Sequence, residues 1–400
     1  MREFDVAIVG AGLAGSIAAA MLARAGHAVA VIDAAKTYPD DFRVEKFDGE
    51  QMRVLARTGL SDIVLASSTL DRSVWVTRLG FLAEKRLSDQ HGFDYGRLVN
   101  TLRAAIPPSA AMMHAKVTAI ANSPKLQRLT LSTGETIEAR LAVLATGLNE
   151  SLRASLGIGR IELERCQSIT FGFDMEPAQA ASFPFRALTH YSEHPRFRAA
   201  YITLFPIGAR MRANFFVYRR LDDPWLRRFR DAPEATLEAV LPSLARFTGP
   251  LRIVGPVKMR PVDLCVTEGY VQPGLVLVGD AFGTACPAAG TGARKALVDI
   301  ERLCNGYVSR WLATPGMDVD KIGAFYADPE KQESDRRSLA LARTTRAMAV
   351  DPGFFWGLRR WLQLGATRAR WTRNLVRAAL SGTVGNTPYD APARPPRQSA

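Results

Sequence analysis

Residues 5–33 read "DVAIVGAGLAGSIAAAMLARAGHAVAVID", with three closely spaced glycines between two apolar runs. An apolar run typical of a buried strand leads into Gly10, Gly12 and Gly15, an Ala-rich segment follows, and a second apolar run ends at Asp33. Glycines at this spacing permit a tight turn, the approach of a pyrophosphate to the backbone and close packing of helix on strand. The pattern predicts a dinucleotide-binding βαβ unit in which Asp33 accepts hydrogen bonds from the adenosine ribose.

A second stretch, residues 274–308, passes directly from a strand into a helix through small residues. "GLVLVG" is typical of a buried strand, and "ARKALVDIERLCNGYV" has the apolar spacing of a helix. The turn between them carries Asp280, Pro287, Gly290 and Gly292. Because the first N–H groups of a helix have no partner inside it, they can bind an electron-rich ligand here. Tight packing of strand on helix is the alternative reason for the glycines.

Together the two stretches resemble the FAD-dependent monooxygenases built like para-hydroxybenzoate hydroxylase (group A), whose relatives are ubiquinone-pathway hydroxylases, flavin halogenases and geranylgeranyl reductases. The resemblance covers about the first three quarters of the chain and implies an α/β (α+β) fold. An FAD-binding Rossmann-like (GR2-type) domain would be interlaced with an antiparallel-sheet substrate domain and followed by a helical C-terminal region. The expected boundaries are 1–70, 101–160 and 271–312 for the FAD-binding parts, 71–100 and 161–270 for the substrate domain, 313–382 for the helical region and 383–400 for a disordered tail.

The resemblance also implies roles for the second stretch. Gly279 and Asp280 would lie by the ribityl and phosphate part of FAD, and Pro287 would lie against the flavin ring. The helix that follows would direct its N-terminus at the flavin N1 and C2 carbonyl edge, where a reduced flavin is negative. Arg43 would reach the pyrophosphate, and Arg97 in "YGRLVNTL" would open a helix beside the cofactor, although each is otherwise a solvated arginine. The predicted FAD site comprises Gly10, Gly12, Leu13, Ala14, Gly15, Asp33, Arg43, Arg97, Val117, Ala145, Thr146, Gly147, Gly279, Asp280, Pro287, Gly290, Thr291 and Gly292.

The sequence departs from the family at the pair Thr146-Gly147, where the aromatic hydroxylases carry Asp-Gly, an Asp tied to FAD and pyridine-nucleotide binding. No second strand-GxGxxG-helix unit occurs in the sequence, which argues against a dedicated nicotinamide domain. Electrons are therefore expected from NAD(P)H bound transiently or from a separate flavin reductase. The halogenase pattern is absent around Trp75, so halogenation is not expected.

The alternating pattern of residues 165–271 predicts an antiparallel sheet. The resemblance implies that this sheet supplies the substrate pocket. Tyr201, Thr203 and Phe205 share one face of a strand, which suits a small apolar or aromatic substrate, although packing in the core of the sheet explains any one of them better. The resemblance implies a hydroxylase or epoxidase that uses molecular oxygen through a flavin C4a-hydroperoxide, and no particular catalytic side chain stands out. Two alternatives remain open: a geranylgeranyl reductase-like enzyme acting on isoprenoid or lipid double bonds, and a non-catalytic flavin-binding protein associated with a membrane.

The formal net charge of +13 is concentrated toward the C-terminus. Residues 351–380, "DPGFFWGLRRWLQLGATRARWTRNLVRAAL", place apolar residues and Trp at helical spacing with arginines largely elsewhere around the helix. Such a helix either packs on the body with a solvated arginine face or binds an anionic membrane surface or an acidic partner. No nucleic-acid module, metal-ligand spacing or transmembrane run occurs, so we expect a cytoplasmic protein, peripheral at the membrane in the second case.

Overall fold

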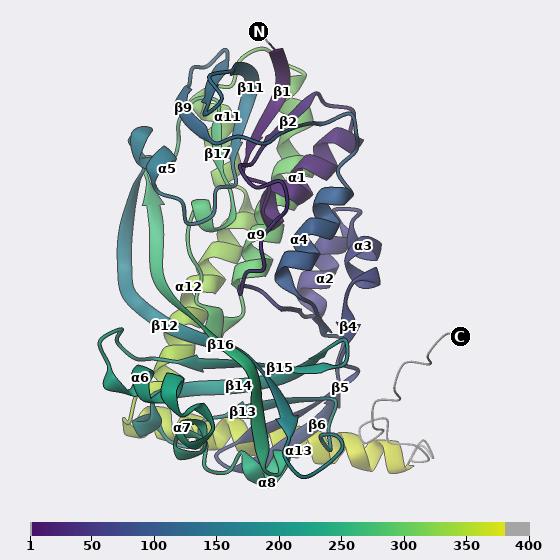
Figure 1. Cartoon of the computed structure of the whole chain (residues 1–400), viewed down its shortest axis with the longest axis vertical. Coiled ribbons are helices and arrows are strands. Elements are labelled where there is room, and N and C mark those ends of the chain that lie inside the picture. The colour runs from purple at the N-terminus through teal and green to yellow at the C-terminus, as the bar shows by residue number, and fades with distance from the viewer. Residues whose placement is uncertain (1, 381–400) are drawn as a thin grey trace. The chain divides into compact units, whose positions relative to one another are not determined.

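The computed structural model describes residues 2–380, and they form two compact units. Unit 1 comprises Met1–Ser67, Phe93–Arg165 and Asp263–Ala340, and unit 2 comprises Ser68–Gly92, Cys166–Val262 and Leu341–Ala400. Three long elements belong partly to each unit: β12 (Gly159–Pro177), β16 (Leu251–Glu268) and α12 (Pro329–Val350) (Figure 1). The chain is thus an interlaced α/β protein, as the sequence predicted, while the predicted tail 383–400 lies outside the described residues.

Unit 1 is built on a sheet whose centre is parallel. β1 (Arg2–Val9) lies between β2 (Val29–Ile32) and β11 (Thr136–Leu144), and β8 (Ala111–Met113) pairs with β2. The C-terminal half of β11 pairs in parallel with β17 (Leu275–Leu277). The two stretches singled out in the sequence, residues 5–33 and 274–308, therefore contribute strands to the same sheet. β10 (Gln127–Leu131) and β9 (Val117–Ala121) continue it as an antiparallel ribbon. The carboxyl ends of β1, β11 and β17 therefore lie at one edge of the sheet.

Both faces of this sheet are buried, which explains why its strands are continuous apolar runs. Val6 and Ile8 of β1 pack in a core with the helices, whereas Ala7 and Val9 point into a second core that includes Leu152. The helices of unit 1 are α1 (Leu13–Arg24), α2 (Gly49–Ala56), α3 (Ser61–Ala66), α4 (Tyr95–Ala104), α5 (Ser151–Ser155), α9 (Gly292–Glu301), α10 (Ser309–Leu312) and α11 (Val319–Tyr326). A π-helical turn, Arg302–Val308, joins α9 to α10.

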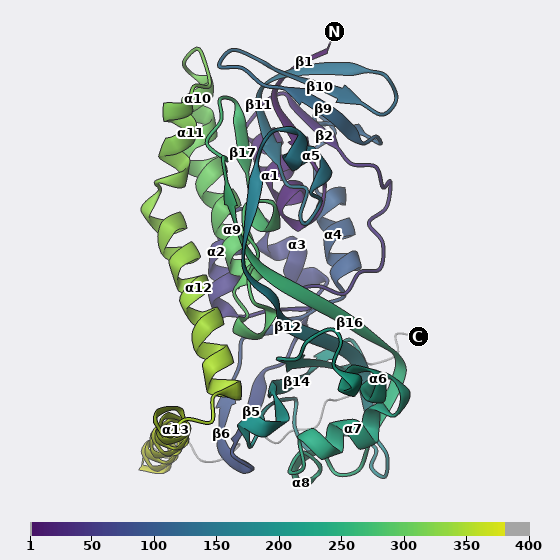
Figure 2. The ribbon, with the colours of Figure 1, turned by 90° about the vertical axis from the view of Figure 1, so that its left-hand side faces the viewer.

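Unit 2 contains the predicted sheet. Its strand order is β16-β12-β15-β14-β13-β5-β6, and β12 and β16 run side by side in Figures 1 and 2. The remaining strands are β5 (Ser73–Arg78), β6 (Phe81–Leu87), β13 (Ala187–Tyr191), β14 (Ala199–Ile207) and β15 (Arg210–Val217). The sheet differs from the prediction in one place: β13 and β5 pair in parallel, whereas the pairs β12–β15, β14–β15, β13–β14 and β5–β6 are antiparallel. The hairpin β14–β15 turns at Gly208, as the sequence predicted. One face packs against α6 (Pro224–Asp231) and α7 (Pro233–Val240) through Phe171, Phe215 and Phe229.

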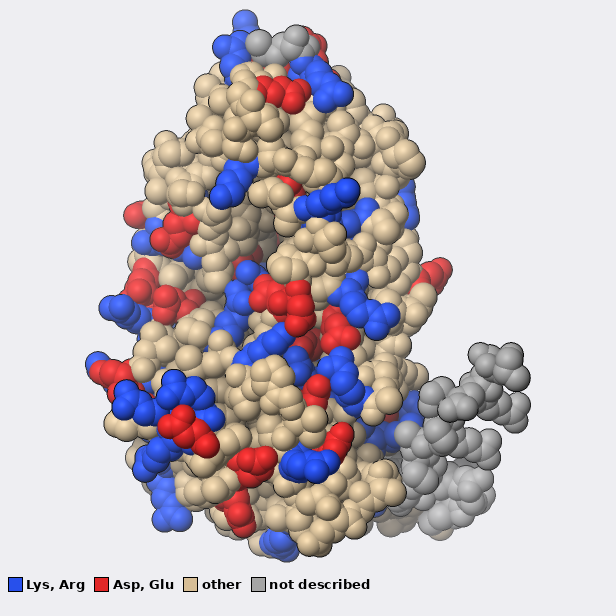
Figure 3. All heavy atoms as spheres, in the orientation of Figure 1, with Lys and Arg blue, Asp and Glu red and all other residues tan. Residues whose placement is uncertain are grey.

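The C-terminal part of unit 2 is α13 (Phe354–Leu380), which lies beside β6 (Figures 1 and 2). Among residues 2–380, no helix is long and apolar enough to cross a bilayer. Figure 3 shows Lys and Arg interspersed with Asp and Glu over one face of the molecule, without a single extended field of either sign. The excess positive charge is instead carried most strongly by α13, whose 27 residues include six arginines and no acidic residue.

Candidate functional site: an FAD cradle in unit 1

Three loops follow neighbouring parallel strands at the same edge of the unit 1 sheet. Gly10–Gly12 follows β1, Ala145–Gly147 follows β11, and Gly279–Asp280 follows β17 after one further residue. A Cβ built on Gly279 would lie 3.4 Å from Cβ of Ala296 in α9 and 3.8 Å from Cβ of Ala14 in α1. The start of α1 and the middle of α9 therefore lie against Gly279, and the structure brings residues 5–33 and 274–308 together at one site.

The three glycines of the first loop meet different steric demands. Gly10 has φ +96°, and a Cβ on it would lie 2.6 Å from the carbonyl oxygen of Ala145. A Cβ on Gly15 would lie 1.8 Å from the carbonyl oxygen of Gly10. For Gly12, by contrast, the nearest described atom to such a Cβ is Cε2 of Tyr38, at 3.9 Å. Gly10 and Gly15 are thus required by the fold, whereas Gly12 leaves backbone open to a ligand.

Asp33 holds the glycine loop together with Arg103, a residue that the sequence analysis missed. Oδ2 of Asp33 accepts a hydrogen bond from Ala11 N at 2.7 Å and pairs with Nη2 of Arg103 at 3.0 Å. Arg103 also donates to the carbonyl oxygens of Ala11 and Ala35, each at 2.7 Å. Arg103 lies in α4 six residues after Arg97, and nothing in its local sequence distinguishes it from a solvated arginine.

A polar cluster surrounds Asp280. Nη1 of Arg43 lies 3.6 Å from Oδ2 of Asp280, and Nε of Arg43 donates to Asp41 at 2.6 Å. Arg160 donates to the carbonyl oxygen of Asp280. The Asp280 side chain is 41% exposed, so its carboxylate stays open to a ligand. Arg43 and Asp280 were each predicted to contact FAD, and the fold brings them together.

The start of α9 is held by residues from two other helices. Nε2 of Gln51 in α2 donates to the carbonyl oxygen of Gly290 at 3.0 Å, and Oγ1 of Thr291 lies 2.7 Å from Oγ of Ser338 in α12. Gly290 has φ +68° and lets the chain reverse before the helix. Within the described part of the chain, neither α1 nor α9 has a side-chain cap. Two helix N-termini therefore offer N–H groups to an anionic ligand.

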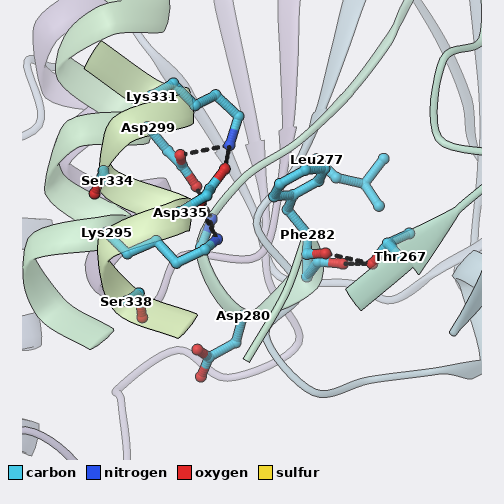
Figure 4. Close-up of polar contacts among 12 residues, drawn as sticks. Thr267, Leu277, Asp280, Phe282, Lys295, Asp299, Lys331, Ser334, Asp335 and Ser338 are labelled. Atoms are coloured by element: carbon cyan, nitrogen blue, oxygen red, sulfur yellow. Dashed lines mark hydrogen bonds and ion pairs between the residues drawn. The ribbon is translucent and has the colours of Figure 1, made fainter. Parts of the chain in front are cut away.

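Four charged side chains form the cluster in Figure 4, which we name the Lys331 cluster: Lys295 and Asp299 of α9, and Lys331 and Asp335 of α12. The first three are buried, and Asp335 is half-buried. Nζ of Lys331 donates to Asp299 at 2.8 Å and to Asp335 at 3.0 Å. Nζ of Lys295 lies 3.3 Å from Asp335 and 3.7 Å from Asp299. Asp299 also accepts the N–H of Gly279 at 2.8 Å, so the cluster anchors the Gly-Asp segment.

The charges of the Lys331 cluster shift one another's proton affinities. Burial alone would raise the pKa of Asp299, but Lys295 and Lys331 outweigh it and the pKa is lowered. Burial alone would lower the pKa of Lys295, but Asp299 and Asp335 outweigh it and the pKa is raised. Lys331 also lies 3.8 Å from the ring centroid of Phe282, a cation–π contact. The opposite charges of the cluster therefore favour the ionised forms of Asp299 and Lys295.

A pH dependence of stability follows from these directions. Because the folded-state pKa of Asp299 is lowered, its contribution is present above the ordinary value of about 3.9 and is lost as pH falls through the folded-state pKa. We expect the difference in melting temperature between the wild type and Asp299→Asn to be large at pH 7 and to shrink in acid, as thermal unfolding at a series of pH values would show. Asp222→Asn, at an exposed aspartate paired with Arg220, is the control and should show a small difference throughout. A pH-independent gap for Asp299→Asn would contradict this reading.

The remaining residues predicted to bind FAD differ in how close they lie to the glycine loops and in how exposed they are. Ala145, Thr146 and Gly147 are half-buried at the end of β11, and a Cβ on Gly147 would lie 4.0 Å from Nη1 of Arg43. Pro287 is half-buried in a short 3-10 turn before Gly290. Arg97 is exposed on the first turn of α4, and Val117 begins β9, packed beside the second core. The contacts of all the predicted site residues with a cofactor stay predictions.

Comparisons with known proteins agree with this geometry. A family model described as an FAD binding domain matches residues 3–88. The 3-demethoxyubiquinol 3-hydroxylase of Escherichia coli (strain K12) is 27% identical over 347 residues, which cover 78% of this chain and 83% of that protein. A ubiquinone hydroxylase of Rhodospirillum rubrum is 28% identical over 324 residues, covering 76% and 72%. The crystal structure of p-nitrophenol 4-monooxygenase from Pseudomonas putida DLL-E4 has a TM-score of 0.74 at 14% identity, covering 97% of this chain and 100% of that one.

The fold, the glycine loop and the relatives define the class: this chain is an FAD-dependent oxidoreductase. Within that class its sequence resembles the group A flavoprotein monooxygenases, and the two relatives named above that it matches are hydroxylases.

Proposed function

We propose that the cradle of unit 1 holds FAD as an extended ligand across the ends of β1, β11 and β17. The observation that carries the proposal is the convergence of two helix N-termini without side-chain caps, in the described part of the chain, on loops whose backbone is open at Gly12. Asp33 takes the adenosine end, Gly12 and Arg43 the pyrophosphate, Asp280 the ribityl chain and Gly292 the flavin edge. The full proposed set is Gly10, Gly12, Leu13, Ala14, Gly15, Asp33, Arg43, Arg97, Val117, Ala145, Thr146, Gly147, Gly279, Asp280, Pro287, Gly290, Thr291 and Gly292.

FAD supplies the redox chemistry when bound, accepting electrons from a reductant and activating molecular oxygen. The chain's own residues position and polarise it. The first turn of α9 would hold the flavin edge that gains negative charge on reduction, and its N–H groups would stabilise that charge. Gln51 and Ser338 hold the backbone of that turn in place, and Asp299 holds Gly279.

The substrate is, in our proposal, an apolar or aromatic small molecule that is hydroxylated. Two relatives are named for hydroxylation of ubiquinone-type molecules, which join an aromatic ring to an apolar tail. In unit 2, Phe215 and Val217 on β15 pack in the core between the sheet and helices α6 and α7. We therefore do not assign them to the substrate pocket. Tyr201 and Phe205 alternate with core residues of β14 and occupy the other face of the sheet. That face is the one we assign to the substrate.

NAD(P)H is the proposed electron donor, bound transiently since the sequence holds one dinucleotide fingerprint. We expect the holo-protein to lose its yellow colour when mixed anaerobically with NADH or NADPH, faster with a bound quinol or phenol-type substrate. On aeration with isotopically labelled oxygen, the label should enter the product, as mass spectrometry would show. A flavin that stays oxidised with both nucleotides would instead assign electron delivery to a separate flavin reductase, and Thr146 would be the residue to examine.

The same experiment separates hydroxylation from its main alternative. A geranylgeranyl reductase-like enzyme would saturate an alkene of an isoprenoid anaerobically, with no label incorporated in air. The departure at Thr146 is the feature that favours this alternative. Product formation without oxygen would therefore overturn the monooxygenase assignment, and a flavin that no reductant could reduce would leave only a non-catalytic flavin-binding role.

As for location, we propose a cytoplasmic protein that works peripherally at an anionic membrane surface, where lipid-like substrates dissolve. The basic C-terminal helix supports this, because it carries six arginines without a single acidic residue.

A further inference from the structure

The apolar stripe of α13 faces away from the protein. The stripe comprises Phe354, Leu358, Trp361 and Leu362 and continues past the small residues Gly365 and Ala369 to Val376. Its large side chains are exposed, Phe354 by 86%, Trp361 by 58% and Leu362 by 63%. The buried residues of the helix are Leu364 and Thr367. At 100° per residue these two lie on roughly the opposite side from the stripe. The alternative that the apolar face of this helix packs on the body of the protein is therefore wrong for the stripe, which is exposed.

The inner side of α13 is fixed to unit 2 by polar contacts. Arg78 of β5 donates to Gln363 at 3.2 Å, and Arg370 lies 3.5 Å from Glu84 of β6. Nε of Arg360 donates to the carbonyl oxygen of Met348 in α12 at 3.0 Å. These polar contacts attach α13 to the rest of unit 2 on the side away from the stripe, so the stripe stays exposed.

Arginines border the stripe. Arg359, Arg373 and Arg377 project beside it along one flank by helical geometry, Arg368 lies on the other flank, and all four are exposed. Long basic side chains in this position can extend to phosphate groups while their aliphatic stems cover apolar surface. Trp and Phe on the apolar side and arginines at its borders are the arrangement of a helix that lies in the plane of a membrane.

We propose that the outward face of α13 inserts into the headgroup region of an anionic lipid bilayer. Charge selects this occupant over a second copy of the chain, since two such helices facing each other would oppose arginines with arginines, whereas an anionic bilayer supplies opposite charge. The helix is about 40 Å long at 1.5 Å per residue, long enough to lie across many headgroups. This inference rests on the proposed function in one respect: membrane binding would give the enzyme access to lipid-like substrates.

The test is co-sedimentation of the full-length holo-protein with phosphatidylcholine vesicles, with and without phosphatidylglycerol. We expect binding to the anionic vesicles that weakens as NaCl is raised. The Trp361→Ser/Leu362→Ser variant should bind roughly tenfold more weakly or worse, because two apolar side chains no longer leave water. Leu221→Ser, which removes a similarly exposed apolar side chain from a loop of unit 2, should bind like the wild type.

Charge is tested in the same assay. Arg373→Gln/Arg377→Gln should reduce binding by roughly tenfold, at about 1 kcal/mol for each basic residue near the surface. Arg220→Gln, at an exposed arginine paired with Asp222, should leave binding unchanged. Brominated lipids should quench the fluorescence of Trp361, and Trp361→Phe should remove that part of the quenching while binding is kept. Retention of flavin absorbance establishes that each variant is folded.

Three results would overturn the proposal. The first is equal vesicle binding by the Trp361→Ser/Leu362→Ser and Leu221→Ser variants. The second is equal binding of the wild type to neutral and anionic vesicles. The third is a wild-type protein that binds no vesicles but sediments as a dimer, with the dimer lost in the Trp361→Ser/Leu362→Ser variant. The assay contains neither substrate nor reductant. Its failure therefore leaves the proposed monooxygenase reaction standing, and an inactive protein that binds vesicles would count against the reaction alone.

Discussion

Gly12→Val is expected to give a folded protein that retains little FAD. The nearest described atom to a Cβ at this position is 3.9 Å away, so the branched side chain can be accommodated by the protein itself. It would instead occupy the space through which a pyrophosphate approaches the backbone. Forcing extra carbon into a closely packed contact costs about 1–3 kcal/mol, so we expect FAD affinity to fall roughly ten- to a hundredfold. Flavin absorbance after gel filtration and titration of the apo-protein with FAD would measure the loss.

Two other glycines give the matched comparison. Gly15→Ala should fail to fold, because its Cβ would lie 1.8 Å from the carbonyl oxygen of Gly10. Gly357→Ala, in α13 where a Cβ meets nothing described within 4 Å, should keep both the fold and the flavin. A Gly12→Val protein with full flavin absorbance would place the cofactor elsewhere, whatever the outcome for the other two.

Lys331→Met is expected to lower the free energy of unfolding by about 3–5 kcal/mol, the usual cost of leaving buried charges without a partner. Lys331 is fully buried and satisfies both Asp299 and Asp335, so its removal leaves two carboxylates to one ammonium group in the Lys331 cluster. Because Asp299 also holds Gly279, FAD affinity should fall as well. Denaturant unfolding and FAD titration would measure the two effects.

The same helix provides the control. Arg336 forms an exposed ion pair with Glu333, so Arg336→Met should cost no more than about 1 kcal/mol. The double variant Lys331→Met/Asp335→Leu removes one charge of each sign and should recover part of the lost stability. Equal unfolding midpoints for Lys331→Met and Arg336→Met would show that the buried cluster does not contribute as described.

Local sequence determined the cofactor half of this protein. A strand, a glycine turn and a helix follow one another within about thirty residues, and their geometry depends on residues that lack a Cβ at fixed spacing. The βαβ unit and the β14–β15 hairpin were therefore predictable, because each depends on short-range periodicity or turn chemistry. The fold class and the interlaced order of the parts followed from the family resemblance that these motifs carry.

Tertiary structure alone decided which distant charges meet and which faces are covered. Arg103 reaches Asp33 across 70 positions of sequence, and Lys331 reaches Asp299 across 32, from segments that read as ordinary charged helices. The direction of α13 could not be predicted either, since an apolar periodicity gives the apolar side of a helix without saying whether protein or solvent lies against it. The physical reason is the same in each case: periodicity is a local property of the chain, whereas burial and charge pairing depend on what long-range packing brings alongside.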